Sequence, residues 1–350
     1  MACIGERVSE IDEDSYGRRP SRTNSRRRSK DRPDFSDAEV GMVVGVDRGR
    51  ITCVVPDGVP HDEQTQVVTV KARELGRKGV VIGDKVRLVG DLSGTPDTLA
   101  RLVEVLERST TLMRTADDTD PIERIIVANA DQLAIVTATT NPEPRVGLID
   151  RTLVAAFESG LEPILILTKT DLKSADDLLS NYSGMDLKYI SVDQTTKQGI
   201  EEVRQQLLGH TTVFIGHSGV GKSTLVNSLV PTAERTTGIV NDVTGRGKHT
   251  STSAQALALP DDTGWVIDTP GLRSFGLAHV DPDAIIESLP ELVDGASECP
   301  RACTHVNSDG IAPPDCALDA WVADGNAGQG GLARLDSLRR LLFALQSHSS

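Results

Sequence analysis

A glycine-rich loop between an apolar run and a helix-like stretch constrains this chain more than any other feature. The segment VFIGHSGVGKSTLVNSLV, residues 213–230, contains the pattern G-x-x-x-x-G-K-S from Gly216 to Ser223. A β-rich run precedes the loop and helical spacing follows it, which is the context that this motif requires. Backbone N–H groups of such a loop point at phosphates, next to a helix N-terminus that favours anions. The sequence therefore predicts a P-loop nucleotide-binding domain rather than a chance glycine-rich turn.

The residue types of the loop predict how it holds a nucleotide. Lys222 would reach the outer phosphates, and the Ser223 hydroxyl would ligate the Mg²⁺ that accompanies the nucleotide. The residues predicted to line the phosphates are Gly216, His217, Ser218, Gly219, Val220, Gly221, Lys222, Ser223 and Thr224.

The segment TKTD, which follows the apolar run PILIL, indicates guanine as the base. It resembles the [NT]KxD motif with which GTPases read guanine. A buried Asp171 carboxylate would accept hydrogen bonds from N1–H and the 2-amino group, and adenine would leave it unpaired. Lys169 would lie along the base. The residues predicted to surround the base are Thr168, Lys169, Thr170 and Asp171, with Ser191 from the later segment YISVD.

A third element, GWVIDTPGL at residues 264–272, is a predicted strand that ends in D-x-x-G. Asp268 would hold Mg²⁺ through water, and the Gly271 N–H would contact the γ-phosphate. The Gly- and Thr-rich segment TGRGKHTSTS, residues 244–253, lies between the loop and this strand. It predicts a switch segment in which Thr250 meets Mg²⁺ and the γ-phosphate.

The order of these elements differs from that of a GTPase of the usual layout, which begins with the phosphate loop. Here TKTD and Ser191 precede the loop, and the switch and DTPG follow it. Joining the old ends of an α/β sheet and cutting it at another loop changes the order without moving the site. The sequence therefore predicts a circularly permuted GTPase domain with a doubly wound α/β sheet.

This order, followed by a Cys/His cluster, resembles the ribosome small subunit-dependent GTPases (the RsgA/YjeQ family) from Ala38 to the C-terminus. The resemblance implies a multidomain α/β protein with an N-terminal OB-fold, a permuted GTPase domain and a C-terminal helical zinc-binding domain. It implies a role in late maturation of the small (30S) ribosomal subunit, with 16S rRNA as a partner.

The resemblance also bears on the chemistry of hydrolysis. Many GTPases orient the attacking water with a Gln just after D-x-x-G, but Leu272 stands at that position. The resemblance implies that His249 of the switch takes this role, as a neutral imidazole that accepts a hydrogen bond from water. The alternative is that His249 contacts the ribosome or only fills the switch.

The cluster CPRACTH…C predicts one structural zinc ion per chain. Cys299, Cys303, His305 and Cys316 offer three sulfurs and one nitrogen, a closed tetrahedral set. Compared with the family pattern, the first gap is one residue shorter, and the last gap, VNSDGIAPPD, is longer. Such a Gly/Pro-rich insertion can loop out between its ends. The alternative is a group of buried reduced thiols with an incidental histidine.

The N-terminal part differs in composition from the rest. Residues 18–32 carry seven Arg and one Lys against one Asp, whereas the whole chain has a formal net charge of −14. The segment predicts a disordered basic arm that contacts phosphate backbones, or a solvated tail without a role. Five short β-rich runs then follow up to residue 106, which predicts an OB-type barrel. It has no aromatic residue for base stacking, so RNA contacts would use Lys71, Arg73, Arg77 and Lys78.

The predicted domain organisation is a basic arm over 1–36, an OB-fold over 37–110, a permuted GTPase domain over 111–280 and a zinc-binding domain over 281–350. The chain has no apolar run of the roughly 18 residues that a membrane span needs and no hydrophobic signal region. We therefore expect a cytoplasmic monomer without a membrane partner. In the predicted C-terminal helix, Arg334, Arg339 and Arg340 would face RNA or solvent.

Two functions of different class are compatible with the sequence. The first is a GTP hydrolase whose GTP or GDP state times its binding to the 30S subunit, with hydrolysis stimulated by 30S and timing its release. The second is a guanine-nucleotide-gated RNA-binding module in which hydrolysis is incidental. The complete set of Mg²⁺-binding residues favours the first.

Overall fold

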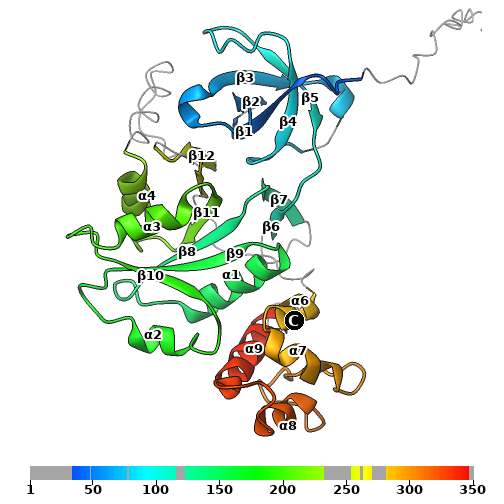
Figure 1. The fold of residues 1–350 in the computed structure, drawn as a ribbon, viewed down its shortest axis with the longest axis vertical. Helices are drawn as coiled ribbons and strands as arrows, with labels where there is room; N and C mark the ends of the chain where they lie inside the picture. Colours follow the sequence, from blue (N-terminus) through cyan, green and yellow to red (C-terminus); the bar gives the residue numbers. More distant parts are fainter. Residues whose placement is uncertain are drawn as a thin grey trace, which may run out of the picture. The chain divides into compact units, whose positions relative to one another are not determined.

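The computed structural model describes residues 34–47, 49–76, 79–115, 123–231, 254–260, 263–269 and 281–346 (Figure 1). The chain divides into two units, Met1–Asp37 and Ala38–Ser350, and the elements named below belong to the second unit. Among the described residues, no helix is both long enough and apolar enough to cross a membrane.

The first five strands close into a small barrel. They are β1 (Glu39–Asp47), β2 (Arg50–Val55), β3 (Thr65–Lys71), β4 (Lys85–Val89) and β5 (Ala100–Val105), with the short 3-10 helices η2 (His61–Glu63) and η3 (Arg73–Leu75) between them. The strand order is β1-β2-β3-β5-β4, and β4 pairs back with β1, which closes the ring. Inward side chains such as Val43, Val67 and Leu102 form its core. The expected OB-type barrel is confirmed.

A second group of strands forms the nucleotide-binding sheet, in the order β10-β9-β8-β11-β13-β12. These strands are β8 (Gln132–Ala138), β9 (Glu162–Thr168), β10 (Lys188–Val192), β11 (Thr211–Gly216), β12 (Gln255–Ala258) and β13 (Trp265–Asp268). All pairings are parallel except that of β12 with β13. Every residue of β8 is buried, as expected of a parallel strand that is covered on both faces.

Helices cover both faces of this sheet, and the alternation of side chains along β8 shows how. Leu133 and Ile135 pack with α1 (Val146–Glu158) on one face. Ala134 and Val136 pack on the other face with α3 (Ile200–Leu207) and α4 (Lys222–Leu229). A short helix, α2 (Asp176–Ser180), follows β9. The doubly wound α/β architecture expected from the sequence is confirmed.

The sheet also shows the permutation directly. The phosphate-loop strand β11 lies in the middle, between β8 and β13, although β8, β9 and β10 all precede it in the chain. The chain therefore crosses from the edge strand β10 through α3 to the centre of the sheet. Because parallel strands share a carboxyl edge, the loops after β9, β11 and β13 meet there.

Three contacts join the barrel to the nucleotide-binding strands. The first is the antiparallel pairing of β1 with β12 at Gly45 and Gln255, which makes the two groups of strands one continuous sheet. A small hairpin of β6 (Thr111–Thr115) and β7 (Glu123–Ala128) meets the barrel through an isolated bridge between Ile82 and Val127. The His61 ring lies edge-on to Trp265 at a centroid distance of 4.5 Å, and its Nε2 contacts the Gly264 carbonyl at 2.8 Å. Both parts therefore belong to one compact unit.

Four helices make up the C-terminal part: α6 (Pro282–Glu287), α7 (Pro290–Ser297), α8 (Ala317–Ala323) and α9 (Gly331–Gln346). The Asp281 side chain caps α6 by accepting a hydrogen bond from the Asp283 N–H at 3.0 Å. Helix α9 lies against α1 (Figure 1) and shares its apolar core through residues such as Leu335 and Leu338.

The arginines of α9 do not face RNA or solvent as expected. Arg334 donates to the carbonyls of Ala327 and Gln329. Arg339 forms a two-pronged ion pair with Asp319, and Arg340 contacts both carboxylate oxygens of the buried Asp150 from its Nε alone. The expectation was wrong because a charge pattern on one helix does not show which carboxylates and carbonyls other elements bring to it.

The close approach of α9 to the nucleotide-binding part gives a first prediction. An added Cβ at Gly184 would overlap the backbone of Ala333 on α9, whereas one at Gly147 on α1 would meet nothing within 4 Å. We expect Gly184→Ala to lower the free energy of unfolding by about 1–3 kcal/mol through overpacking. Gly147→Ala is the matched control and should be neutral or stabilising by about 1 kcal/mol. Denaturant unfolding measures both, and equal effects would contradict the packing described here.

Candidate functional site

The phosphate loop connects β11 to α4 at the carboxyl edge of the sheet. Gly219 and Gly221 adopt φ values of 85° and 91°, which only glycine reaches without strain. An added Cβ at Gly216 would stand 2.6 Å from the Val136 carbonyl oxygen, so the loop also needs glycine where it leaves the strand. Ser218, Gly219, Ser223 and Thr224 are exposed. The loop thus presents its backbone and the first turn of α4 to an incoming ligand.

The TKTD segment lies directly against this loop. The Thr168 hydroxyl donates to the Val220 carbonyl at 2.5 Å and is fully buried. The Lys169 ammonium donates to the Gly219 carbonyl at 3.0 Å. The structure therefore brings together two motifs that lie about fifty residues apart in the chain, as the permuted layout predicts.

Thr170 is half-buried and Asp171 is exposed at the end of this segment. Asp171 was expected to be buried. In the protein without a nucleotide its side chain is exposed, so this expectation was wrong. A carboxylate that reads a base lies open until the base covers it. The unpaired-carboxylate argument against adenine therefore applies only to a complex with bound nucleotide.

The third motif meets the phosphate loop through an ion pair. The Lys222 ammonium donates to Asp268 Oδ1, and both side chains are largely buried. Thr269, the next residue, is buried and donates from its hydroxyl to the Phe214 carbonyl at 3.0 Å, which fixes the start of the D-x-x-G segment against β11. A phosphate bound in the loop would replace Asp268 as the ion-pair partner of Lys222. The Asp268 carboxylate could then accept a hydrogen bond from a metal-bound water.

The loops that follow β10 and β8, beside the predicted base site, contain contacts that the sequence did not indicate. Ser191 is exposed and lies within β10, one residue before the strand ends. Gln194, further along, donates from its amide to the Gly221 carbonyl at 2.8 Å. On the other side, the Asn141 carbonyl accepts from Lys169. Both residues follow strands at the carboxyl edge, and that position is the signal that could have indicated them.

Three predicted residues of the switch and the D-x-x-G segment, His249, Thr250 and Gly271, lie outside the described residues. The basic arm and the barrel residues Arg77 and Lys78 lie outside them too, except for residues 34–36 of the arm.

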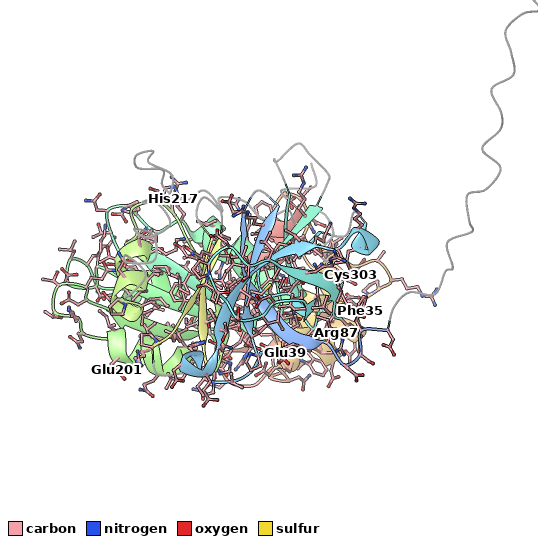
Figure 2. The ribbon with its side chains drawn as sticks, turned by 90° about the horizontal axis from the view of Figure 1, so that it is seen from above. Phe35, Glu39, Arg87, Glu201, His217 and Cys303 are labelled. Carbon is pink, nitrogen blue, oxygen red and sulfur yellow. The ribbon has the colours of Figure 1, made fainter. Side chains whose placement is uncertain are left out.

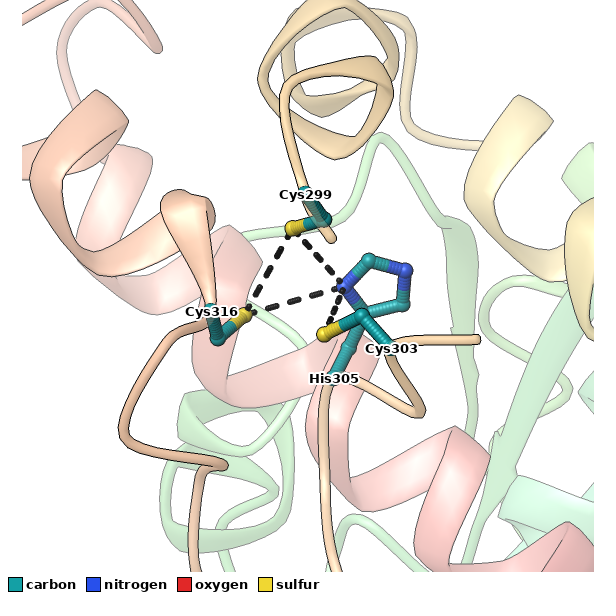
Figure 3. A group of neighbouring side chains, drawn as sticks. All are labelled: Cys299, Cys303, His305 and Cys316. Atoms are coloured by element: carbon teal, nitrogen blue, oxygen red, sulfur yellow. Dashed lines mark hydrogen bonds between the residues drawn. The ribbon is translucent and has the colours of Figure 1, made fainter. Parts of the chain in front are cut away.

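A second site lies in the C-terminal part, where the side chains of Cys299, Cys303, His305 and Cys316 converge (Figure 3). The His305 Nδ1 atom lies 3.6 Å from Cys299 Sγ and 3.7 Å from both Cys303 Sγ and Cys316 Sγ. Cys299 Sγ and Cys316 Sγ are 4.0 Å apart. Corners of a tetrahedron with zinc–ligand bonds of about 2.0–2.3 Å stand roughly 3.5–3.8 Å apart. The cluster therefore has the donor set of a structural zinc site, and its four ligand atoms all lie within 4.8 Å of one another.

The surroundings of Cys299 and His305 favour the neutral forms of these two side chains. Burial raises the pKa of the Cys299 thiol to about 11, although the Ala317 N–H donates to its sulfur at 3.2 Å. Burial, followed by the nearby Arg339 charge, lowers the pKa of His305. Metal binding at this cluster would therefore release the proton of the Cys299 thiol.

The phosphate loop and the cluster are separate sites. Figure 2 shows His217 of the loop and Cys303 of the cluster well apart in the molecule. A metal held by the cluster is thus remote from the phosphates, which is compatible with a structural and not a catalytic ion.

Comparison with known proteins agrees with this geometry. The family model for RsgA GTPases matches residues 105–278. A protein named small ribosomal subunit biogenesis GTPase RsgA 1, from Vibrio vulnificus, is 30% identical over 337 residues, which are 94% of this chain and 92% of that protein. The chain belongs to the RsgA GTPase family. A second member of the family, from Ectopseudomonas mendocina, is 38% identical over 227 residues, and the match covers 63% of each chain.

Solved structures show the same fold. The structure of YjeQ from Thermotoga maritima superimposes with a TM-score of 0.63 and 26% identity, covering 88% of this chain and 98% of that one. The structure of YloQ, described as a circularly permuted GTPase, superimposes with a TM-score of 0.61 and 21% identity, covering 89% and 96%. Over most of its length, the chain therefore has the fold of these two proteins.

The buried Thr168 contact gives a prediction for the nucleotide site. Thr168→Val keeps the shape of the side chain but leaves the Val220 carbonyl without its donor. We expect the free energy of unfolding to fall by about 1–3 kcal/mol, and GDP affinity to fall because the loop is no longer held. Denaturant unfolding and titration with fluorescent GDP measure the two effects. Thr168→Ser keeps the hydroxyl and should behave like the original protein; equal behaviour of Val and Ser would refute the role of this contact.

Proposed function

We propose that this protein is a GTP hydrolase that acts in late maturation of the small (30S) ribosomal subunit, with 16S rRNA as its partner. The observation that carries the proposal is the meeting of three motifs at one edge of the sheet. The phosphate loop contacts TKTD through Thr168 and Lys169, and it contacts Asp268 through Lys222. The names of the family relatives support the ribosomal role.

The phosphate loop would bind the outer phosphates of GTP. Residues 216–224 supply backbone N–H groups at the start of α4, and Lys222 supplies the fixed cation. Ser223 and Thr250 would hold Mg²⁺ directly, and Asp268 through water. When bound, this ion neutralises charge on the β- and γ-phosphates. The Gly271 N–H would contact the γ-phosphate.

The base would lie between the TKTD segment and the loop that follows Ser191. Asp171 is exposed and free to accept from both guanine donors, while the Lys169 ammonium is held on the Gly219 carbonyl with its stem along the site. Contact between Lys169 and the phosphate loop supports guanine recognition, because it fixes the distance between the base and the phosphates.

Hydrolysis needs a water in line with the γ-phosphate. Leu272 carries no polar group for this purpose, and we assign the role to His249. A neutral imidazole would accept a hydrogen bond from the water as its oxygen attacks phosphorus and GDP leaves. A partner that orders the switch would raise the rate, so the 30S subunit both stimulates hydrolysis and is released by it.

The metal cluster is proposed to bind one structural zinc ion per chain, through Cys299, Cys303, His305 and Cys316.

Domain limits near residues 37, 110 and 280 fit the observed elements, because the barrel ends with β5 and α6 begins after residue 280. The basic arm and the exposed Arg73 would contact RNA phosphates. We further propose a monomer that works in the cytoplasm, where its partner is assembled.

The alternative is a guanine-nucleotide-gated RNA-binding module in which hydrolysis is incidental. GTP turnover with and without 30S particles separates the two. We expect 30S to stimulate the GTP turnover of the original protein strongly. Lys222→Ala should lose hydrolysis and bind GTP more weakly. His249→Ala should lower the 30S-stimulated kcat by roughly 10²–10⁴-fold. GTP affinity of His249→Ala should barely change. Turnover that 30S leaves unaltered would favour the binding module.

Base recognition gives a separate prediction. Asp171→Asn should shift preference away from guanine and towards xanthine, because an amide cannot accept from both guanine donors and can donate to a carbonyl. Competition binding with GTP, XTP and ATP measures the shift. Preserved selectivity for GTP would remove Asp171 from the base site.

The metal site predicts one zinc ion per chain that is lost, together with folding of the C-terminal helices, in Cys303→Ser. Elemental analysis and far-ultraviolet circular dichroism measure the two effects. Cys53 lies buried in the barrel, away from the cluster, so Cys53→Ala is the control that should keep its zinc. Purified protein without zinc would restore the interpretation as reduced thiols.

A further inference from the structure

Two consecutive arginines on α9 contact two different parts of the molecule. Neighbouring residues of an α-helix point about 100° apart, so one helix can bind on two sides at once. Arg339 turns towards the metal cluster, and Arg340 turns towards α1 and the segment after α2. This arrangement places the cluster and the nucleotide-binding part on a single rigid element.

Arg339 is built into the edge of the cluster. Its Nη2 atom lies 3.8 Å from Cys316 Sγ, and its Nε donates to the His305 carbonyl at 3.1 Å. Asp319 orients the guanidinium through two hydrogen bonds of 2.8 and 2.7 Å. Three thiolates and a neutral imidazole around a divalent ion carry one net negative charge, and Arg339 supplies a cation beside it.

Arg340 is equally fixed on the other side. Its Nε contacts both oxygens of Asp150 on α1 at 3.2 and 3.1 Å, and its guanidinium lies 4.8 Å from the Tyr182 ring centre. The Tyr182 hydroxyl donates to the same carboxylate at 3.0 Å. Asp150 is only 2% exposed, so its charge depends on these partners.

Helix α1 continues from this contact towards the phosphate loop. Its capping residue Arg145, together with Leu148 and Arg151, lines a cavity beside the loop that His217 also lines. At the same time Gly184 packs tightly on Ala333 of α9. A change in how α9 is held would therefore reach α1, and through α1 the neighbourhood of the phosphates.

We propose that α9 couples metal binding at the cluster to the stability of α1 in the nucleotide-binding part, with Arg339 as the positioning residue at the metal and Arg340 as the positioning residue at α1. The proposal rests on the metal site proposed above. Loss of the ion frees the cluster residues, loosens Arg339 and α9 with it, and weakens the contact of Arg340 with Asp150.

Hydrogen exchange of α1 in the GDP-loaded, full-length protein tests the coupling, with metal content measured on the same samples. Removal of the metal by a chelator should speed exchange of α1 by about 5- to 150-fold, the usual range of coupling between sites. Arg339→Met should lose its metal at roughly 10- to 100-fold lower chelator concentration. These effects concern binding and local opening, so they do not depend on GTP turnover.

The coupling itself is tested at Arg340. Because Arg340→Met alone leaves a buried charge on Asp150, the double variant Arg340→Met with Asp150→Asn removes both partners. Its α1 should respond to metal removal by a smaller factor than α1 of the original protein, because the shared core and the packing of Gly184 on Ala333 remain. Arg334→Met is the matched control, because within the described part of the chain the hydrogen bonds and ion pair of Arg334 go to Ala327, Gln329 and Glu291, and not to the cluster or α1. This variant should respond to metal removal like the original protein.

Three results would overturn the proposal. Unchanged exchange of α1 in the original protein after measured loss of metal would show that the two parts are uncoupled. A double variant that responds to the chelator as strongly as the original protein would show that Arg340 does not carry the coupling. A protein purified without any metal would refute the metal site, and with it this proposal, while leaving guanine-nucleotide binding to be judged by its own assay.

Discussion

The pairing of β11 with β8 on one side and β13 on the other determines where the phosphate loop and Asp268 lie. Its register sets Gly216 beside Val136 and Phe214 beside Asp268, so the phosphate loop leaves the sheet level with the D-x-x-G segment. The pairing of β8 with β9 then brings Thr168 level with Ala138, within reach of the Val220 carbonyl. Since the site depends on which strands are neighbours, and not on their order in the chain, a permuted chain can form it unchanged.

The sequence predicted this architecture well because buried parallel strands and glycine-rich loops leave strong local patterns. The run QLAIVTA of β8 is apolar enough to read as a strand buried on both faces. Contacts between loops leave no such pattern, which is why Gln194 and Asn141 were missed. The exposure of Asp171 was misjudged because its cover is the ligand, and the arginines of α9 were misassigned because Asp150 and Asp319 lie far from them in the sequence.

The Cys/His cluster shows why an irregular spacing in the sequence does not keep its four residues apart. The loop before Cys316 departs from the family pattern, but closing a longer loop costs little additional entropy. Its backbone is also held locally, since the Asn307 N–H donates to the Ile311 carbonyl at 2.8 Å and the Gly310 N–H donates to the Asn307 carbonyl at 2.9 Å. The loop therefore returns Cys316 to the start of α8, where its sulfur lies 3.7 Å from His305 Nδ1. Val306, the first residue of the loop, is buried in the main hydrophobic core.

The C-terminal helices pack against α1 on one face of the nucleotide-binding sheet and share its hydrophobic core. One continuous core contains Leu133 of the sheet, Leu153 of α1, Ile285 of α6 and Leu338 of α9. Two helices that share a close-packed core cannot shift independently, because such interiors resist small changes of volume. The ion pair of Arg340 with Asp150 orients α9 relative to α1. The residues of the metal cluster hold the opposite side of α9 through Arg339. A site remote from the phosphates thereby contributes to the rigidity of the helix that flanks them.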